Sequence, residues 1–234
     1  MNTADIVLLA GGLATRLKPV TEKIPKSLIE VAGKPFIYHQ LMLLKSVSVK
    51  KVVICAGYLG EQIQNYVGDG SRFGIEVRYS FDGDKLLGTG GAVRKCLGEV
   101  EENFFVMYGD SYLDTEFEII NEYFLKSSKS GLMTVLKNEG KWDKSNVEFN
   151  NGQIIRYDKK NTDANMKYID YGLGMFNKRA FEDFKNTEIF DLEEVYRNLL
   201  EKNELAGFEV KERFYEIGSF DGISDTERYL KSKK

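Results

Sequence analysis

A glycine-rich turn near the start of the chain could hold phosphate groups. The segment Leu9-Ala-Gly-Gly-Leu-Ala-Thr-Arg-Leu17 contains two adjacent glycines followed by an arginine. Adjacent glycines let the backbone approach a phosphate closely and present N–H groups to it. Arg16 adds a planar fork of donors that suits phosphate oxygens. The spacing fits neither the dinucleotide fingerprint nor the phosphate loop that ends in Gly-Lys-Ser/Thr. Taken alone, the segment predicts either a phosphate-binding turn or a tight turn beside a solvated arginine.

Three further clusters carry groups that suit the same chemistry. Lys26 follows Pro25, which fixes the local backbone, and lies ten residues beyond Arg16. The segment Leu87-Gly-Thr-Gly-Gly-Ala92 would let a flat base lie against the backbone, although it could also be a plain glycine-rich turn. Asp110, in Tyr108-Gly-Asp110, follows an apolar run and offers a carboxylate that can hold a metal ion.

Composition narrows the chemistry further. The 234 residues are 42% hydrophobic, which excludes a disordered chain, and the net charge of −3 provides no basic field for nucleic acid. His39 is the only histidine, and we expect it to be a packing or surface residue. Histidine-dependent hydrolases and polyhistidine zinc sites are therefore improbable. Cys55 and Cys96 form no disulfide framework and are expected to be small core residues. The early apolar run, residues 6–10, is too short for a signal or a membrane span, so we expect a cytoplasmic protein.

The elements that must position these residues alternate between strand and helix in the first half. Such alternation predicts a doubly wound, mainly parallel, Rossmann-like α/β sheet with a glycine turn after the first strand. The expected strands are 6–10, 51–56, 75–80 and 104–108, and the expected helices are 35–45, 61–67, 90–100 and 116–129.

After Gly131 the pattern changes and predicts a mixed extension of the sheet. Asn150-Asn-Gly152 is a hairpin turn signal, and Trp142 lies in the preceding loop, where it could belong to a lid or a partner contact. We therefore expect one domain, 1–234, with halves at 1–130 and 131–234. The expected strands of the second half are 132–137, 147–149, 154–157, 168–176, 205–210 and 213–217, with helices at 178–184, 191–202 and from about 223.

Taken together, the clusters resemble the sugar-1-phosphate nucleotidyltransferases. That family carries a signature similar to Gly-Gly-x-Gly-Thr-Arg-Leu, followed by Pro-Lys, Lys-Pro, Leu-Gly-Thr-Gly/Ala and Gly-Asp, and all occur here in that order. The resemblance covers essentially the whole chain. It is strongest to the short bacterial heptose 1-phosphate guanylyltransferases and N-acetylmuramate 1-phosphate uridylyltransferases. It implies a GT-A-like nucleotidyltransferase fold.

The resemblance also implies roles for residues of the first half. Arg16 and the backbone amides of Gly11–Thr15 would hold the β- and γ-phosphates of a nucleoside triphosphate, and Lys26 would contact the α-phosphate. Asp110 matches a ligand of Mg²⁺, the expected cofactor. The implied catalytic residues are thus Arg16 and Lys26, and the implied nucleotide-binding residues are Ala10, Gly11, Gly12, Ala14, Thr15, Gly57, Gly88 and Thr89.

In the second half the resemblance implies a sugar-phosphate site. Lys159, preceded by Asp158, resembles the lysine of a Glu-Lys pair that binds the sugar phosphate. Asp170-Tyr-Gly172 lies where the family often has Asn-Ala-Gly, which touches sugar hydroxyls. Glu216, in Tyr215-Glu-Ile-Gly218, would be the second metal carboxylate, where aspartate is usual. Ala14, Asp158, Asp170 and Glu216 all depart from the commoner residue, and Asp170 and Glu216 bear on the sugar pocket and the metal geometry.

The physics of nucleotidyl transfer agrees with this composition. A sugar phosphate is already an oxyanion, so it needs no general base to attack the α-phosphorus, and the barrier is dominated by bringing two polyanions together. We predict an enzyme that makes a nucleotide-activated sugar for a surface polysaccharide, as a monomer or homodimer, without nucleic-acid or membrane partners.

The leading hypothesis is a D-glycero-α-D-manno-heptose 1-phosphate guanylyltransferase. Alternatives are a uridylyltransferase or another nucleotidyltransferase that uses a different sugar 1-phosphate or a phosphorylated alcohol. A non-catalytic nucleotide-sugar sensor and a related glycosyltransferase also remain. Retained Arg16, Lys26 and Asp110 argue against a sensor, and Asp110-Ser-Tyr112 lacks the Asp-x-Asp that is usual in glycosyltransferases.

Overall fold

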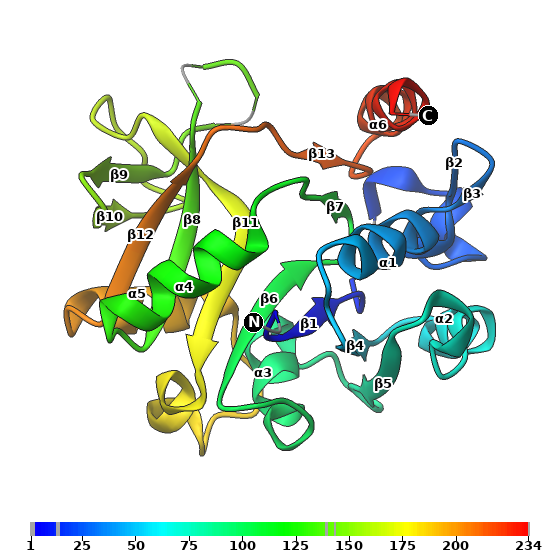
Figure 1. The fold of residues 1–234 in the computed structure, drawn as a ribbon, viewed down its shortest axis with the longest axis horizontal. Helices are drawn as coiled ribbons and strands as arrows, with labels where there is room; N and C mark the ends of the chain where they lie inside the picture. Colours follow the sequence, from blue (N-terminus) through cyan, green and yellow to red (C-terminus); the bar gives the residue numbers. More distant parts are fainter. Residues whose placement is uncertain (1–2, 13–14, 139, 143, 234) are drawn as a thin grey trace.

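In the computed structural model, which describes residues 3–12, 15–138, 140–142 and 144–233, nine strands form one continuous sheet (Figure 1). In sheet order they are β5 (Glu76–Phe81), β4 (Lys51–Ala56), β1 (Asp5–Leu9), β6 (Asn103–Tyr108), β11 (Tyr168–Asn177), β8 (Gly131–Lys137), β12 (Leu205–Val210), β10 (Gln153–Tyr157) and β9 (Val147–Asn150).

The first four strands of that order are parallel, and the rest form a mixed sheet. β4 pairs with β5 and β1, and β1 pairs with β6, all in parallel. β11 then joins β6 and β8 in the antiparallel sense, and β12 runs parallel to β8. The predicted α/β class, with a mainly parallel first half and a mixed extension, is confirmed. The proposed boundary between the halves at residue 130 stays a prediction, because the sheet runs through it without interruption.

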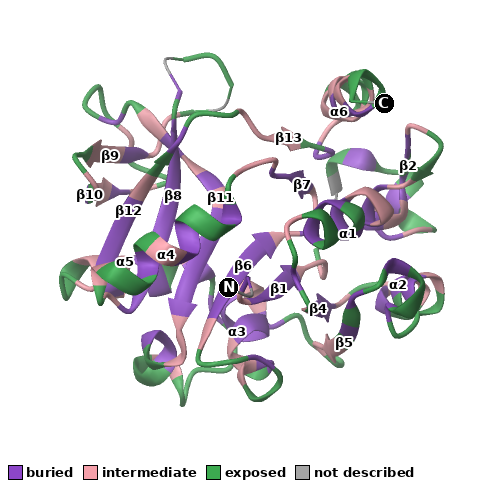
Figure 2. Ribbon diagram, viewed as in Figure 1, coloured by how far each residue is buried: buried purple, intermediate pink, exposed green. Residues whose placement is uncertain are grey.

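Helices cover both faces of the sheet, and the core lies in the two layers between them (Figures 1 and 2). Side chains of α1, α2 and α4 join one buried cluster and those of α3 and α5 join the other. A third cluster fixes α6 beside the first loop region. The helices are α1 (Phe36–Ser46), α2 (Gly60–Val67), α3 (Gly88–Lys95), α4 (Phe117–Ser127), α5 (Leu192–Glu201) and α6 (Phe220–Ser232).

The described part of the long segment between β1 and α1 contains short regular elements that its sequence does not predict. It contains the short 3-10 helices η1 (Thr15–Leu17), η2 (Val20–Glu22) and η3 (Lys26–Leu28) and the hairpin of β2 (Glu30–Val31) with β3 (Lys34–Pro35). Each piece is too short to leave a periodic apolar pattern. Pro35 immediately precedes α1 rather than occupying its first turn.

Some elements in the rest of the chain differ in type or extent from the expected ones. The helix predicted at 90–100 is α3 followed by a separate 3-10 helix, η5 (Leu97–Glu99), and the helix predicted at 178–184 is the 3-10 helix η6 (Lys178–Phe184). The strand predicted at 213–217 is reduced to β13 (Tyr215–Glu216), which pairs with β7 (Ser111–Tyr112) in a small sheet of its own.

The predictions for the hairpin turn, the two cysteines and His39 are confirmed. Asn151 and Gly152 have positive φ angles of 47° and 82°, as a tight hairpin between β9 and β10 requires. Cys55 and Cys96 are buried core residues, and the ring of His39 packs at a half-buried position 2.7 Å from the Val31 carbonyl. None of the helices formed by the described residues combines the length and the apolar character needed to cross a bilayer.

Candidate active site

The loops at the carboxyl ends of β1, β5 and β6 line a first cavity of about 240 Å³. In an open α/β sheet this edge is where ligands bind, at the point where the strand order reverses. The predicted nucleotide-binding residues Ala10, Gly11, Gly12, Gly88 and Thr89 line it, together with the predicted catalytic Lys26 and metal-binding Asp110. The structure therefore brings together residues from four sequence clusters.

Gly57, in the loop after β4, contacts the glycine-rich turn that lines this cavity. A Cβ atom on Gly57 would lie 2.7 Å from the Gly11 carbonyl oxygen, and one on Gly11 would lie 3.0 Å from the Gly57 backbone nitrogen. Two loops that approach this closely exclude any side chain between them. The local physical reason for glycine at both positions is therefore the contact between the loops.

The start of α3 forms another wall of the first cavity. Gly88 has a φ of +72°, and a Cβ atom there would lie 2.5 Å from the Phe190 carbonyl oxygen. The Thr89 amide and hydroxyl both lie 3.2 Å from one carboxylate oxygen of Asp191, and the Leu192 amide donates to the Thr89 hydroxyl at 2.8 Å. The Thr89 side chain thus fastens α3 to α5.

Lys26 and Asp110 form the most direct contact in the site. Pro25 keeps the chain extended, so that η3 begins at Lys26. The Lys26 ammonium donates to Asp110 Oδ2 at 2.8 Å, and the two side chains are 18% and 29% exposed. Lys26, expected at the α-phosphate, and Asp110, expected at the metal, are therefore in direct contact. Both side chains remain accessible to water and to a ligand.

A second cavity of about 310 Å³ adjoins the first and shares Tyr108 and Asp110 with it. Its lining includes the predicted sugar-phosphate residues Lys159, Asp170 and Gly172 and the predicted metal ligand Glu216. Because Asp110 belongs to both cavities, two ligands bound side by side would meet at the Lys26–Asp110 pair.

Asp170 is held firmly in the wall of the second cavity. Its side chain is 5% exposed, and its Oδ2 atom lies 3.8 Å from the Lys159 ammonium. Tyr157 donates its hydroxyl to Oδ2 at 3.2 Å, and the Gly172 amide donates to Oδ1 at 3.0 Å. Burial and the charge of Asp170 raise the pKa of the Tyr157 hydroxyl, so it stays a hydrogen-bond donor.

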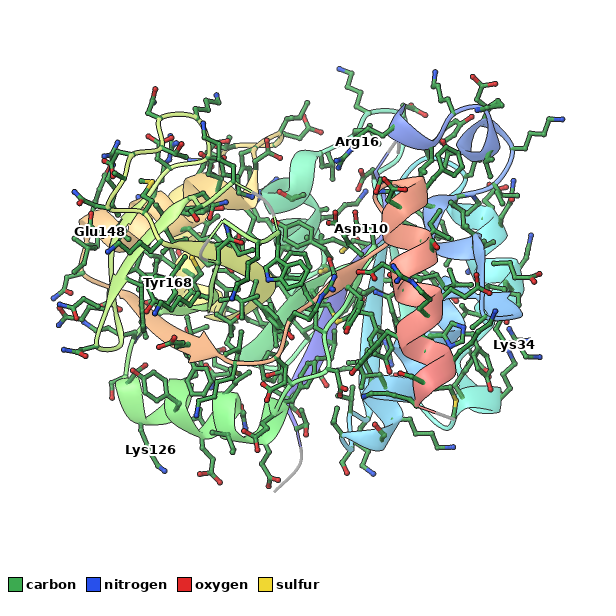
Figure 3. All side chains as sticks on the ribbon, turned by 90° about the horizontal axis from the view of Figure 1, so that it is seen from above. Arg16, Lys34, Asp110, Lys126, Glu148 and Tyr168 are labelled. Carbon is green, nitrogen blue, oxygen red and sulfur yellow. The ribbon has the colours of Figure 1, made fainter. Side chains whose placement is uncertain are left out.

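Glu216 reaches the second cavity through the small sheet. In the pairing of β13 with β7 it lies opposite Ser111, and the Ile217 amide donates to the Asp110 carbonyl at 2.9 Å. A Cβ atom on Gly218 would lie 3.5 Å from both an Arg16 guanidinium nitrogen and a Glu216 carboxylate oxygen. Arg16 thus lies on the Glu216 side of the site, and Figure 3 shows it with Asp110 beside the first turn of α6.

Asp158 occupies a different position from its predicted partners. Its carboxylate accepts the backbone amides of Lys160 and Asn161, each at 2.8 Å, and lies 3.5 Å from Arg197 of α5. Those backbone hydrogen bonds lower its pKa to about 2. The observed contacts are those of a turn that orients Lys159, and direct binding of sugar phosphate by Asp158 stays a prediction. The nucleotide-binding prediction for Ala14 and the side chain of Thr15 lies outside the described residues.

Sequence reasoning missed several lining residues of the first cavity. Asp82 immediately follows β5, Asp191 precedes α5, and Ser27 follows Lys26. A search for polar residues just beyond each parallel strand would have found Asp82. Asp191 carried no such signal, because it approaches the cavity from the second half of the chain.

Comparison with known proteins agrees with this geometry. The family model described as nucleotidyl transferase matches residues 5–233. A D-glycero-α-D-manno-heptose 1-phosphate guanylyltransferase from Campylobacter jejuni is 28% identical over 213 residues, which cover 91% of this chain and 93% of the relative. A mannose-1-phosphate guanylyltransferase catalytic subunit beta from Drosophila melanogaster is 27% identical, with 93% of this chain and 60% of the relative covered. The solved structure of HddC from Yersinia pseudotuberculosis has a TM-score of 0.80 at 23% identity, and the match covers 97% of this chain and 99% of that one.

Two adjoining cavities lie at the carboxyl ends of the strands. Their lining of a glycine-rich turn, cations and carboxylates is typical of an α/β protein that binds phosphate esters. Because the family model matches nearly the whole chain, the chain belongs to the nucleotidyl transferase family. It is an enzyme that transfers a nucleotidyl group.

Proposed function

We propose that this nucleotidyltransferase moves a guanylyl group from GTP to D-glycero-α-D-manno-heptose 1-phosphate, giving the GDP-sugar and pyrophosphate. One observation carries the proposal: two cavities, one glycine-lined and one lined by Lys159 and Asp170, meet at the Lys26–Asp110 pair. The heptose is supported by the name of the Campylobacter jejuni relative, which matches over almost its full length.

In the proposed reaction a phosphate oxygen of the sugar phosphate attacks the α-phosphorus of GTP. A new P–O bond forms on one side while the bond to the β-phosphate breaks on the other, and pyrophosphate leaves with the electron pair. Lys26, at the junction of the cavities, would neutralise charge on the α-phosphate, and Arg16 would hold the departing phosphates. Space for the phosphates is left at Gly12, where a Cβ atom would lie more than 4 Å from the non-neighbouring residues that the structure describes.

We propose Mg²⁺ as the cofactor, held by Asp110 and Glu216. Mg²⁺ is typically bound by one or two carboxylates together with substrate phosphates. The donor set fits that habit: both carboxylates line the second cavity, and no cluster of three or more His, Cys, Asp or Glu residues among the described positions would hold an ion alone. When bound, Mg²⁺ would neutralise phosphate charge and help align the two substrates.

Guanine is supported by the placement of Asp82. Its carboxylate lines the first cavity, and Oδ2 accepts the Leu87 amide at 3.3 Å, which leaves lone pairs for a ligand. Guanine presents two adjacent donors, N1–H and N2–H, that a carboxylate can accept together. Uracil presents one donor between two carbonyl oxygens, which a carboxylate repels. Burial raises the pKa of Asp82, so GTP binding should weaken as falling pH protonates it.

The first test is a screen of GTP, UTP, CTP and ATP against a panel of sugar 1-phosphates and phosphorylated alcohols, with pyrophosphate release as the readout. We expect the highest kcat/KM for GTP with the heptose 1-phosphate. Preference for UTP or CTP would overturn the base, and preference for another acceptor would overturn the sugar. Absence of any acceptor-dependent pyrophosphate release would favour the nucleotide-sugar sensor instead.

The base assignment has a sharper test in Asp82→Asn. An amide at this position would donate to the carbonyl that xanthine carries where guanine carries its N2 amino group. The ratio of kcat/KM for xanthosine triphosphate to that for GTP should therefore rise at least tenfold. Asp84→Asn, two residues further along the loop and outside the cavity lining, is the matched control. An unchanged ratio in Asp82→Asn would remove Asp82 from base recognition.

We also propose that the enzyme works in the cytoplasm. Cys55 and Cys96 are free, with sulfur atoms 3.6 Å apart, as expected where thiols are kept reduced.

A further inference from the structure

The second cavity contains a lysine that has no assigned function. Lys144, from the loop that joins β8 to β9, lines the cavity together with Lys159, which comes from the loop after β10. Lys159 already lies 3.8 Å from the buried carboxylate of Asp170, so part of its charge is offset inside the protein. A phosphate monoester carries close to two negative charges at neutral pH. A doubly charged group is matched better by two cations than by one, and Lys144 places a second lysine in the same lining.

Described residues on both sides of Lys144 are held by hydrogen bonds. On the N-terminal side, Asn138 accepts the Trp142 amide at 3.0 Å and donates to the Ser145 hydroxyl at 2.9 Å. On the C-terminal side, the Asn146 side chain accepts the Asp170 amide at 3.0 Å. These contacts tie the described residues on either side of Lys144 to one another and to the wall of the cavity.

Trp142 packs against the segment that leads into β13. The Arg213 guanidinium lies 3.8 Å from the centre of the Trp142 ring system and 4.3 Å from the Tyr215 ring. Arg213 also donates to Asp225 of α6 at 2.6 Å. Tyr215 immediately precedes Glu216, so the stack joins the Lys144 loop to the strand that carries the proposed metal ligand.

We propose that Lys144 is a second phosphate-binding residue of the sugar-phosphate cavity, and that Trp142 stacked on Arg213 is the device that positions it. The proposal rests on the proposed function, because it assumes that the second cavity takes the sugar phosphate. Lys144 would contact the ligand directly, and Trp142 and Arg213 would act through Lys144.

The test begins with Lys144→Ala and its matched control Lys141→Ala, which removes a lysine from the same loop outside the cavity lining. Lys144→Ala should raise the KM for the sugar 1-phosphate about tenfold, as expected for one charge-assisted hydrogen bond, with the KM for GTP within twofold of wild type. The increase should shrink at high salt. Lys141→Ala should leave both KM values unchanged. Equal KM values for the sugar phosphate in the two variants would overturn the assignment.

The positioning device is tested by Trp142→Ala against Trp142→Phe. Phenylalanine keeps an aromatic face for Arg213, so it should retain the wild-type KM for the sugar phosphate, whereas alanine should raise it as Lys144→Ala does. If Trp142→Ala loses solubility, Arg213→Lys tests the same stack, because lysine keeps the charge but loses the planar face. A KM for the sugar phosphate that stays at the wild-type value in both Trp142→Ala and Arg213→Lys would refute the positioning role.

Binding can also be read without turnover, because Trp142 is the only tryptophan in the chain. Its fluorescence should change on titration with D-glycero-α-D-manno-heptose 1-phosphate in the absence of GTP, and Lys144→Ala should shift the midpoint about tenfold upwards. This readout separates the two claims. Sugar-phosphate binding that depends on Lys144 but leads to no turnover would refute the proposed function alone. Turnover that is indifferent to Lys144 would refute this inference alone.

Discussion

Lys26→Ala should abolish most of the turnover while the fold survives. Lys26 lies at the junction of the two cavities, where a phosphate oxygen about 3 Å from its ammonium would gain about 5 kcal/mol at an effective dielectric constant near 20. Only the part of this attraction that grows in the transition state accelerates the reaction. Deletions of comparable oxyanion-stabilising groups cost about 3–4 kcal/mol, so we expect kcat to fall by about 10²–10³-fold.

The same substitution should have little effect on the free energy of unfolding. Its partner Asp110 is 29% exposed, so water can solvate the carboxylate that the lysine leaves behind, and the cost should be about 1 kcal/mol. Pyrophosphate release at saturating substrates measures kcat, and thermal unfolding measures stability. Lys18→Ala is the matched control, because its side chain is 57% exposed in the same segment. A kcat for Lys26→Ala within about threefold of this control would show that the lysine is not at the reacting centre.

Four further outcomes follow from the same geometry. Excess chelator should stop pyrophosphate release, and full activity under chelation would contradict the assignment of Mg²⁺ to Asp110. Lys159→Ala should raise the KM for the sugar phosphate more than that for GTP, whereas the reverse would mean that the two cavities are assigned the wrong way round. Glu216→Gln should lower kcat and raise the Mg²⁺ concentration needed for half-maximal rate, with thermal stability nearly unchanged; an ordinary Mg²⁺ titration would leave Asp110 as the sole protein ligand. Asp158 has a folded-state pKa of about 2 against its usual 3.8, so it stabilises the fold while ionised and the contribution is lost as pH falls from about 4 towards 2. Asp158→Asn should therefore lower the Tm at pH 7 and match wild type near pH 2, and a difference that persists in acid would refute this account.

The parallel half of the sheet was readable from the sequence because of where its strands lie. β1 and β4 are covered on both faces, so they appear as unbroken apolar runs between polar loops. The order of the strands in the second half could not be read in the same way. A period of two identifies which face of a strand is buried, but nothing in β11 shows that it pairs with β6 and β8 on its two edges.

Short elements at the site escaped prediction for a different reason. β13 has two residues, and its position is set by pairing with β7, which lies more than a hundred residues earlier in the chain. Glu216 could therefore be suggested only by resemblance to a family pattern. The same resemblance assigned Asp158 to ligand binding, although its carboxylate accepts the backbone amides of Lys160 and Asn161. Neither the β13–β7 pairing nor these hydrogen bonds can be recognised in the sequence.

The junction between the two cavities follows from the place of β6 in the sheet. β6 pairs on one edge with β1, which leads into the glycine-rich turn, and on the other with β11, which carries Asp170 and Gly172. Residues at its carboxyl end therefore lie between the glycine-rich turn and β11, and Tyr108 and Asp110 do line both cavities. A Cβ atom on Gly172 would lie 3.4 Å from the Tyr108 ring, so the wall between the cavities is one aromatic side chain thick. The change from parallel to antiparallel pairing at β6 thus brings the glycine-rich turn and the Asp170–Gly172 segment to the two cavities that share one carboxylate. Two polyanions could meet there only beside a cation, and the Lys26 ammonium donates to that carboxylate.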